Sequence, residues 1–209
     1  MEKADRKQHW ENIYQTKNLK EVSWYQSKPT ISLEFLNTFS LANDARIIDI
    51  GGGDSLFVDE LLKLGYSNIT VLDISASSLE RAKERLGEKA SKIKWIVADA
   101  AEFIPQEQYD FWHDRAAFHF LTTELEISNY VNNLEKFIAK DGVLVMGTFS
   151  ENGPEKCSGI EIKQYTESSM SQLLNRVFEK IKCIYTDHLT PFNTIQNFVF
   201  CSFKKQSIA

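Results

Sequence analysis

The residues best suited to bind a ligand lie where an apolar segment ends. Asp49 stands near the end of Arg46–Ile50 and is followed by three consecutive glycines, Gly51, Gly52 and Gly53. Glycines let the backbone turn sharply and approach a ligand closely. A tight strand-to-helix turn without a ligand is the plain alternative, but it does not need three glycines. The triplet therefore favours a ligand site.

A second acidic residue, Asp73, ends the next apolar segment, Asn68–Asp73. In an open α/β sheet, ligands bind beyond the carboxyl ends of the strands. A carboxylate at this place can accept hydrogen bonds from both hydroxyls of a ribose, whereas the alternative is a helix-capping aspartate. A glycine turn and a carboxylate one βα unit apart indicate a nucleoside-containing cofactor. We expect Asp73 to be partly exposed.

The glycine turn departs from two common phosphate-binding motifs. Gly51 and Gly53 match the start of the dinucleotide fingerprint G-x-G-x-x-G, but Leu56 stands at its third glycine. That glycine permits close packing of helix on strand, so its absence weakens the prediction of a nicotinamide cofactor. No Gly-Lys-Ser/Thr follows, so the chain has no P-loop. An NAD(P)-dependent oxidoreductase and a non-catalytic cofactor-binding module stay as alternatives.

The elements that position these residues alternate between apolar strands and amphipathic helices, which predicts a parallel sheet with helices on both faces. We expect strands at 46–50, 68–73, 93–98, 109–113, 143–149, about 180–187 and 196–204. We expect helices at about 54–64, from Ser75 to Gly87, from Thr123 to about 139, and after Thr166. Thr123 and Glu126 have the spacing of a capping box. The tight link between the last two strands predicts an antiparallel pair.

The first 40 residues contain two further helical segments, at about 4–17 and 30–39, with Trp24 and Tyr25 between them. We interpret residues 1–40 as a helical cap over the open end of the sheet. An arm that packs on the back of the sheet is the alternative. Residues 41–205 then form one compact ligand-binding domain.

Several segments together resemble one known family. They are Ile47–Gly53, Leu72–Ser75, Val97–Ala100, Tyr109–Phe111 and Asp141–Val145. In this order and spacing, over about residues 31–204, the chain resembles the class I S-adenosylmethionine-dependent methyltransferases. The resemblance implies a Rossmann-like, seven-stranded, mostly parallel sheet with its last strand antiparallel. One departure is Ser55, which stands where the family often has a third glycine.

The resemblance also implies roles for individual residues in binding S-adenosylmethionine. The methionine part of the cofactor would lie near Asp49 and the glycines 51–53. Asp73 would bind the ribose hydroxyls, and Ile74 would contact adenine. Asp99 would bind the adenine amino group, with Ala100 beside it.

The polar segment 113–120 follows the fourth expected strand, where a buried strand should end, and we interpret it as the catalytic region. Asp114 or His113 is expected to orient the cofactor amine or an acceptor. His119 is expected to act as a base, because an unperturbed histidine titrates near neutral pH. Arg115 is expected to hold a substrate carboxylate or to pair with a local acid, and Tyr25 to form a lid over the acceptor. The alternative is a structural polar cluster.

Composition excludes several other classes of protein. The chain has 209 residues, a formal net charge of −5 and 43% hydrophobic residues, which is typical of a globular domain and does not suggest nucleic-acid binding. No apolar run approaches the ~18 residues of a membrane span. The N-terminus lacks the apolar stretch of a secretory signal. A cytoplasmic protein is therefore expected.

The cysteines and histidines suggest neither a disulfide framework nor a metal site. Cys157, Cys183 and Cys201 are odd in number and far apart, and the four histidines lack metal-ligand spacing.

The sequence thus predicts a methyltransferase whose acceptor is not identified. A small molecule is preferred, because the cap and the loop after 143–149 can enclose a pocket. A protein (lysine) methyltransferase is the alternative, suggested by Trp10, Tyr14, Trp24 and Tyr25 ahead of the first strand. The sequence does not indicate the oligomeric state.

Overall fold

Seven strands form one twisted sheet in the computed structural model, which describes residues 3–206. The strands are β1 (Arg46–Ile50), β2 (Asn68–Asp73), β3 (Ile93–Val97), β4 (Tyr109–Arg115), β5 (Ile138–Phe149), β8 (Phe178–Leu189) and β9 (Ile195–Lys205). Their spatial order is β3-β2-β1-β4-β5-β9-β8. Strand β9 runs in the direction opposite to that of the other six strands of this sheet. The predicted Rossmann-like sheet with an antiparallel last strand is confirmed.

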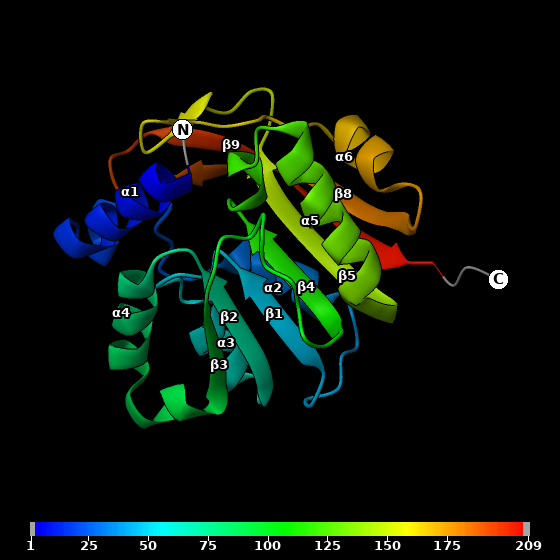
Figure 1. Ribbon diagram of the computed structural model, residues 1–209, viewed down its shortest axis with the longest axis horizontal. Helices are drawn as coiled ribbons and strands as arrows, with labels where there is room; N and C mark the ends of the chain where they lie inside the picture. The colour runs from blue at the N-terminus through cyan, green and yellow to red at the C-terminus, as the bar shows by residue number, and fades with distance from the viewer. Residues whose placement is uncertain (1–2, 207–209) are drawn as a thin grey trace.

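Helices cover both faces of the sheet, and Figure 1 shows α5 and α6 in front of it with α2 and α3 behind. The α-helices are α1 (Lys3–Thr16), α2 (Thr30–Asn37), α3 (Phe57–Lys63), α4 (Ala76–Leu86), α5 (Glu124–Phe137) and α6 (Glu167–Leu174). Three 3-10 turns, at Leu19–Glu21, Gly87–Lys92 and Phe118–Phe120, and a short hairpin of β6 (Lys156–Cys157) and β7 (Ile160–Glu161) complete the described elements.

Two apolar layers fill the space between helices and sheet. Successive strand residues point to opposite faces, so Ile48 belongs to the layer under α5 and α6, and Ile47 to the layer under α2, α3 and α4. Both side chains are fully buried. The parallel strands, being covered on both faces, read as nearly continuous apolar runs, which is why they were recognisable in the sequence.

The helix starts follow from side-chain caps. The Ser75 hydroxyl accepts a hydrogen bond from Ser78 N at the start of α4, and a capping box of Thr123 and Glu126 begins α5, as predicted. Helix α3 begins at Phe57, not near residue 54 as predicted. The reason is local: the Ser55 hydroxyl accepts a hydrogen bond from Phe57 N at 3.1 Å, so residues 54–56 remain in the turn.

Strand β5 is longer than predicted, because it begins at Ile138 instead of 143. The expected turn at 140–142 is a local irregularity within the strand. Asp141 takes a left-handed conformation with φ 61°, and the register with β4 shifts between Tyr109 and Phe111. The backbone therefore bends without leaving the sheet.

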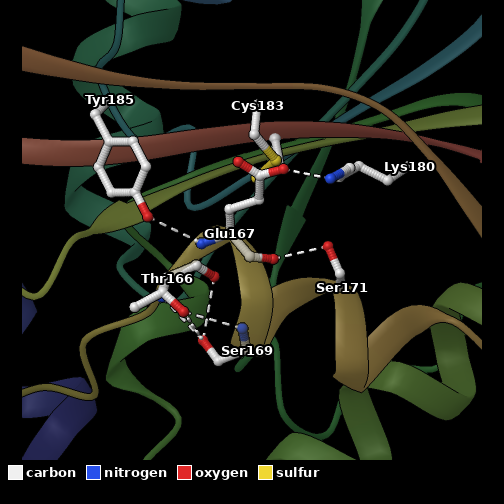
Figure 2. The surroundings of a disulfide bond; sticks show 8 residues. Thr166, Glu167, Ser169, Ser171, Lys180, Cys183 and Tyr185 are labelled. Carbon is white, nitrogen blue, oxygen red and sulfur yellow. Dashed lines mark hydrogen bonds and ion pairs between the residues drawn. A yellow bond between two sulfur atoms is a disulfide. The ribbon is translucent and has the colours of Figure 1, made fainter.

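The expectation of no disulfide is wrong for two of the three cysteines, because Cys183 and Cys201 are joined. They are distant in sequence but are register partners on β8 and β9. Figure 2 shows the bond beside the start of α6, where Tyr185 accepts a hydrogen bond from the backbone of Glu167 and Lys180 pairs with the Glu167 side chain. Strand pairing, which spacing along the chain does not reveal, brings the cysteines together.

Candidate functional site

A pocket lies at the carboxyl ends of β1, β2, β3 and β4. Strand β1 has β2 on one side and β4 on the other, so the chain order reverses at this point of the sheet. Such a switch point is where open α/β sheets bind their ligands. The pocket is therefore in the place that the sequence predicted.

The glycine turn after β1 forms one wall of the pocket. Gly51 has φ +64°, and a Cβ added there would lie 2.6 Å from Ala117 Cβ. A Cβ added to Gly52 would lie 2.7 Å from Asp49 Oδ2. Gly51, Gly52 and Asp49 line the pocket, whereas Gly53 is outside its lining. The turn keeps its path only with glycine at positions 51 and 52.

Asp73 lines the pocket at the end of β2, next to Ile74. Its side chain is buried, at 5% exposure, so the expectation of partial exposure is wrong. Oδ1 accepts a hydrogen bond from Ser75 N at 2.8 Å. Burial raises the pKa of Asp73 to about 7. Oδ2 faces the glycine turn, 3.0 Å from the position of a Cβ on Gly53.

Asp99 follows β3 and lines the pocket together with Ala100. Its Oδ1 accepts a hydrogen bond from Ala101 N at 2.9 Å, and its Oδ2 lies 3.0 Å from Arg6 Nη2. Arg6 also pairs with Glu126, at 2.6 Å. Sequence reasoning missed Arg6, whose only signal is a cationic residue in the first helical segment.

The N-terminal segment covers the pocket with aromatic rings. Trp10, Tyr14 and Trp24 line it together with Tyr25, the predicted lid residue. Ring centroids of Trp10 and Trp24 are 5.6 Å apart in an edge-to-face arrangement. Arg81 of α4 donates a hydrogen bond to the Tyr14 carbonyl at 3.0 Å, which fixes α1 against α4. The domain boundary at residue 40 stays a prediction.

A chain of hydrogen bonds crosses from β1 to α2 through His113. His113 Nδ1 lies 2.7 Å from Asp49 Oδ1, and Nε2 lies 2.9 Å from Ser32 Oγ. The imidazole also packs against Phe57, with ring centroids 4.2 Å apart. Asp49, His113 and Ser32 are all buried and all line the pocket. Ser32 was not recognised in the sequence because it lies 81 positions from its histidine partner.

Asp114 and His119 lie outside the pocket lining. Asp114 is fully buried: Oδ1 accepts from the backbone amides of residues 117 and 118, and Oδ2 accepts from the Tyr130 hydroxyl at 2.6 Å. Burial raises the pKa of Asp114 to about 6. Burial, and then the charge of Arg115, lower the pKa of His119 to about 3, so this imidazole is neutral. Their catalytic roles stay predictions, and the geometry supports a structural part for Asp114.

The fold places a glycine turn and two acidic strand ends around one pocket, the arrangement that the sequence predicted for a nucleoside cofactor. Residues 47–142 match the model of a methyltransferase domain. One relative is malonyl-[acyl-carrier protein] O-methyltransferase 2 of Ilyobacter polytropus, 29% identical over 51% of this chain and 40% of that protein. Another is EEF1A lysine methyltransferase 2 of Homo sapiens, which is 26% identical over 44% of this chain and 43% of that protein. The match to the methyltransferase domain covers a little under half of the chain, and it agrees with the resemblance to the class I S-adenosylmethionine-dependent methyltransferases that the sequence predicts.

The solved structures agree with this fold. The N-methyltransferase NodS from Bradyrhizobium japonicum, in complex with S-adenosylhomocysteine, superposes with a TM-score of 0.68. It is 16% identical and the match covers 94% of this chain and all of NodS. In contrast, the chain spans less than half the length of the two curated relatives. None of the helices within residues 3–206 is long and apolar enough to cross a membrane.

Proposed function

We propose that this chain transfers a methyl group from S-adenosylmethionine to a small-molecule acceptor. The observation that carries the proposal is one pocket with acidic strand ends at one side and an aromatic cover contributed by residues 10–25. When bound, the cofactor supplies a sulfonium methyl group, whose S–C bond breaks as the acceptor forms its own bond to that carbon. Much of the protein's contribution to such a displacement is alignment and exclusion of water.

The donor groups on the strand ends fit the cofactor. Asp73 has one oxygen used by Ser75 N and a second directed at the glycine turn, where ribose hydroxyls can donate to it. Charge-assisted hydrogen bonds of this kind are stronger than neutral ones. Asp99 keeps its carboxylate at the pocket, supported by Arg6, as expected for a partner of the adenine amino group. Ile74 and Ala100 offer apolar contacts to the base.

The remaining residues position the methionine part and the acceptor. Gly51 and Gly52 let the turn pass close to Ala117 and Asp49, and both glycines line the pocket. The two ring nitrogens of His113 form hydrogen bonds with Asp49 and Ser32, and these bonds fix the orientation of all three side chains. Tyr25 and Arg115 line the pocket and are proposed to contact the acceptor. Asp114 and His119 support the wall behind them.

A protein lysine acceptor is the second candidate. The observation in its favour is the similarity to EEF1A lysine methyltransferase 2. The enclosed aromatic cover favours the small molecule, since a protein side chain must enter from outside. The cytoplasmic location stays a prediction.

Cofactor and acceptor class are tested separately. S-adenosylmethionine and S-adenosylhomocysteine are expected to raise the melting temperature, because a ligand that binds only the native state stabilises it. NAD and NADP are expected to have no effect, and a response to them alone would overturn the proposal. Labelled S-adenosylmethionine is then incubated with a metabolite extract and, separately, with a protein extract. Label confined to protein would replace the small-molecule acceptor by the second candidate.

A further inference from the structure

Arg115 ends β4 with an unusual set of partners. Its Nη1 donates a hydrogen bond to the Trp24 carbonyl at 3.1 Å, and the guanidinium lies over the Phe198 ring at 5.0 Å from the centroid. Nε and Nη2 are buried and have no hydrogen-bond partner among the described residues. An unpaired buried donor costs free energy, so this edge of the guanidinium calls for a partner.

The edge of the Arg115 guanidinium formed by Nε and Nη2 has the geometry that binds a carboxylate through two hydrogen bonds. Nε and Nη2 point their N–H bonds in parallel, which matches the two oxygens of a carboxylate. The same protein uses this edge elsewhere. Arg46 donates from Nε and Nη2 to the two oxygens of Asp110, at 3.0 and 2.8 Å, and Arg85 does so to Asp59, at 3.2 and 2.8 Å. Arg115 presents this fork to no carboxylate of residues 3–206.

The described residues place no carboxylate in contact with Arg115, and the charge of Asp49 acts on the guanidinium only from beyond ion-pair distance. Within the described part of the chain, no carboxylate lies within ion-pair distance of it. The neighbouring Cys157 thiol is not an anion, because burial raises its pKa to about 12. Burial lowers the pKa of Arg115 itself to about 10, so the guanidinium stays charged at neutral pH. A buried charge without a partner is destabilising unless a ligand pairs with it.

The position of Arg115 belongs to the acceptor half of the pocket. Strand β4 lies on one side of β1, whereas β2 and β3, which carry Asp73 and Asp99, lie on the other. Arg115 shares its half with Cys157 and with the rings of Trp24, Tyr25 and Phe120, all lining the same pocket. This half therefore combines one cation with an apolar, largely aromatic surface.

We propose that Arg115 is the anchor for the carboxylate of the acceptor, which is a small carboxylic acid with an apolar, aromatic body. The inference rests on the proposed methyl transfer and names the substrate class of that site. A carboxylate held by both Nε and Nη2 has its charge neutralised by the guanidinium. The two hydrogen bonds also fix the orientation of the acceptor, so that a different, nucleophilic atom of the acceptor faces the methyl group.

The test uses the full chain saturated with S-adenosylhomocysteine, and calorimetric titration with benzoate, phenylacetate and 3-phenylpropionate, each beside its neutral amide. At least one acid is expected to bind tenfold or more tightly than its amide, because the amide has no charge to pair with the guanidinium. Arg115→Met is expected to remove this preference, and Arg115→Lys to restore part of it. Arg176→Met is the matched control, since Arg176 is exposed and pairs with Glu135.

Four outcomes decide the matter. Normal binding of S-adenosylhomocysteine with no acid preferred over its amide refutes the anchor but leaves the proposed function standing, whereas failure of wild-type protein to bind S-adenosylhomocysteine refutes the proposed function. A preference that survives in folded Arg115→Met refutes the anchor as well. The cofactor's own carboxylate is the rival ligand: if Arg115→Met weakens S-adenosylhomocysteine tenfold but leaves 5′-methylthioadenosine unchanged, Arg115 serves the cofactor and the acceptor assignment is overturned.

Discussion

Replacing Asp73 separates its two tasks, binding a ribose and supporting a turn. In Asp73→Asn the side-chain oxygen still accepts the hydrogen bond of Ser75 N, but the charge is gone. Asp73→Ala removes that acceptor too and leaves a buried amide unsatisfied. We therefore expect Asp73→Asn to fold nearly as stably as the wild type and Asp73→Ala to lose about 1–3 kcal/mol of unfolding free energy.

The expected loss of cofactor affinity follows from the charge on the hydrogen bonds. Bonds to a charged group contribute roughly 1.5–3 kcal/mol, so Asp73→Asn should bind S-adenosylhomocysteine about tenfold to a hundredfold more weakly. Calorimetric titration at pH 8 measures this loss. Urea unfolding of the same samples checks that the variants are folded.

The pH dependence of binding gives an independent readout. Burial raises the pKa of Asp73 to about 7 in the ligand-free protein. Ribose hydroxyls that donate to the carboxylate favour its ionised form, so affinity should rise with pH and fall about tenfold from pH 8 to pH 6. The opposite sign holds for folding without ligand: the contribution of protonated Asp73 to stability is full below about pH 4 and is lost as pH rises through about 7. Wild-type affinity in folded Asp73→Asn, or an equal pH slope in both proteins, would refute the ribose contact.

Three other substitutions test separate parts of the structure. Asp114→Ala should lower the unfolding free energy by about 1–3 kcal/mol in urea while leaving S-adenosylhomocysteine affinity unchanged, because it deprives the Tyr130 hydroxyl of its buried acceptor; weakened binding without lost stability would contradict this. Gly52→Ala should weaken S-adenosylhomocysteine at least tenfold in titration, because its Cβ would lie 2.7 Å from Asp49 Oδ2; unchanged affinity would show that the turn adapts. Cys183→Ser should lower the unfolding free energy of the oxidised protein by at most about 3 kcal/mol, and with it the melting temperature, since the disulfide closes a loop of 18 residues; a dithiothreitol-treated wild type should then melt like the variant.

The positions of the acidic residues at the pocket were predictable from the sequence because these residues lie at or just after strand ends. Asp73 is the last residue of β2, and Asp99 lies two positions after the end of β3. Both strands are recognisable in the sequence as apolar segments, so the acidic residues at their ends are recognisable too. Strand β1 matches its predicted bounds residue for residue. What the sequence did not reveal is burial: Asp73 is enclosed by residues of α1 and by the start of α4, which are far from it along the chain or known only after folding.

The catalytic segment was harder to interpret because of strand alternation. The predicted strand ended at His113, but β4 continues to Arg115. Neighbouring residues of a strand face opposite sides, so His113 and Arg115 reach the pocket while Asp114 points into the layer under α5. A polar residue that satisfies backbone amides and a tyrosine inside the protein has the same sequence signature as one that faces a ligand. Only the strand's true end distinguishes them.

The charged side chains around the pocket suit a reaction in which a positively charged sulfonium group becomes neutral. Asp49, Asp73 and Asp99 line one half, and Arg115 is the unpaired cation of the other, so the pocket offers anionic surface to a sulfonium cofactor and cationic surface to an acid. Transfer of the methyl group converts the sulfonium into a neutral thioether. In a pocket lined by the rings of Trp10 and Trp24, this loss of charge is easier than in bulk solvent, because the reactants have less hydration to lose when they react. Burying Arg115 without a carboxylate partner among residues 3–206 is destabilising, and pairing it with an acceptor carboxylate converts that cost into selectivity for acids.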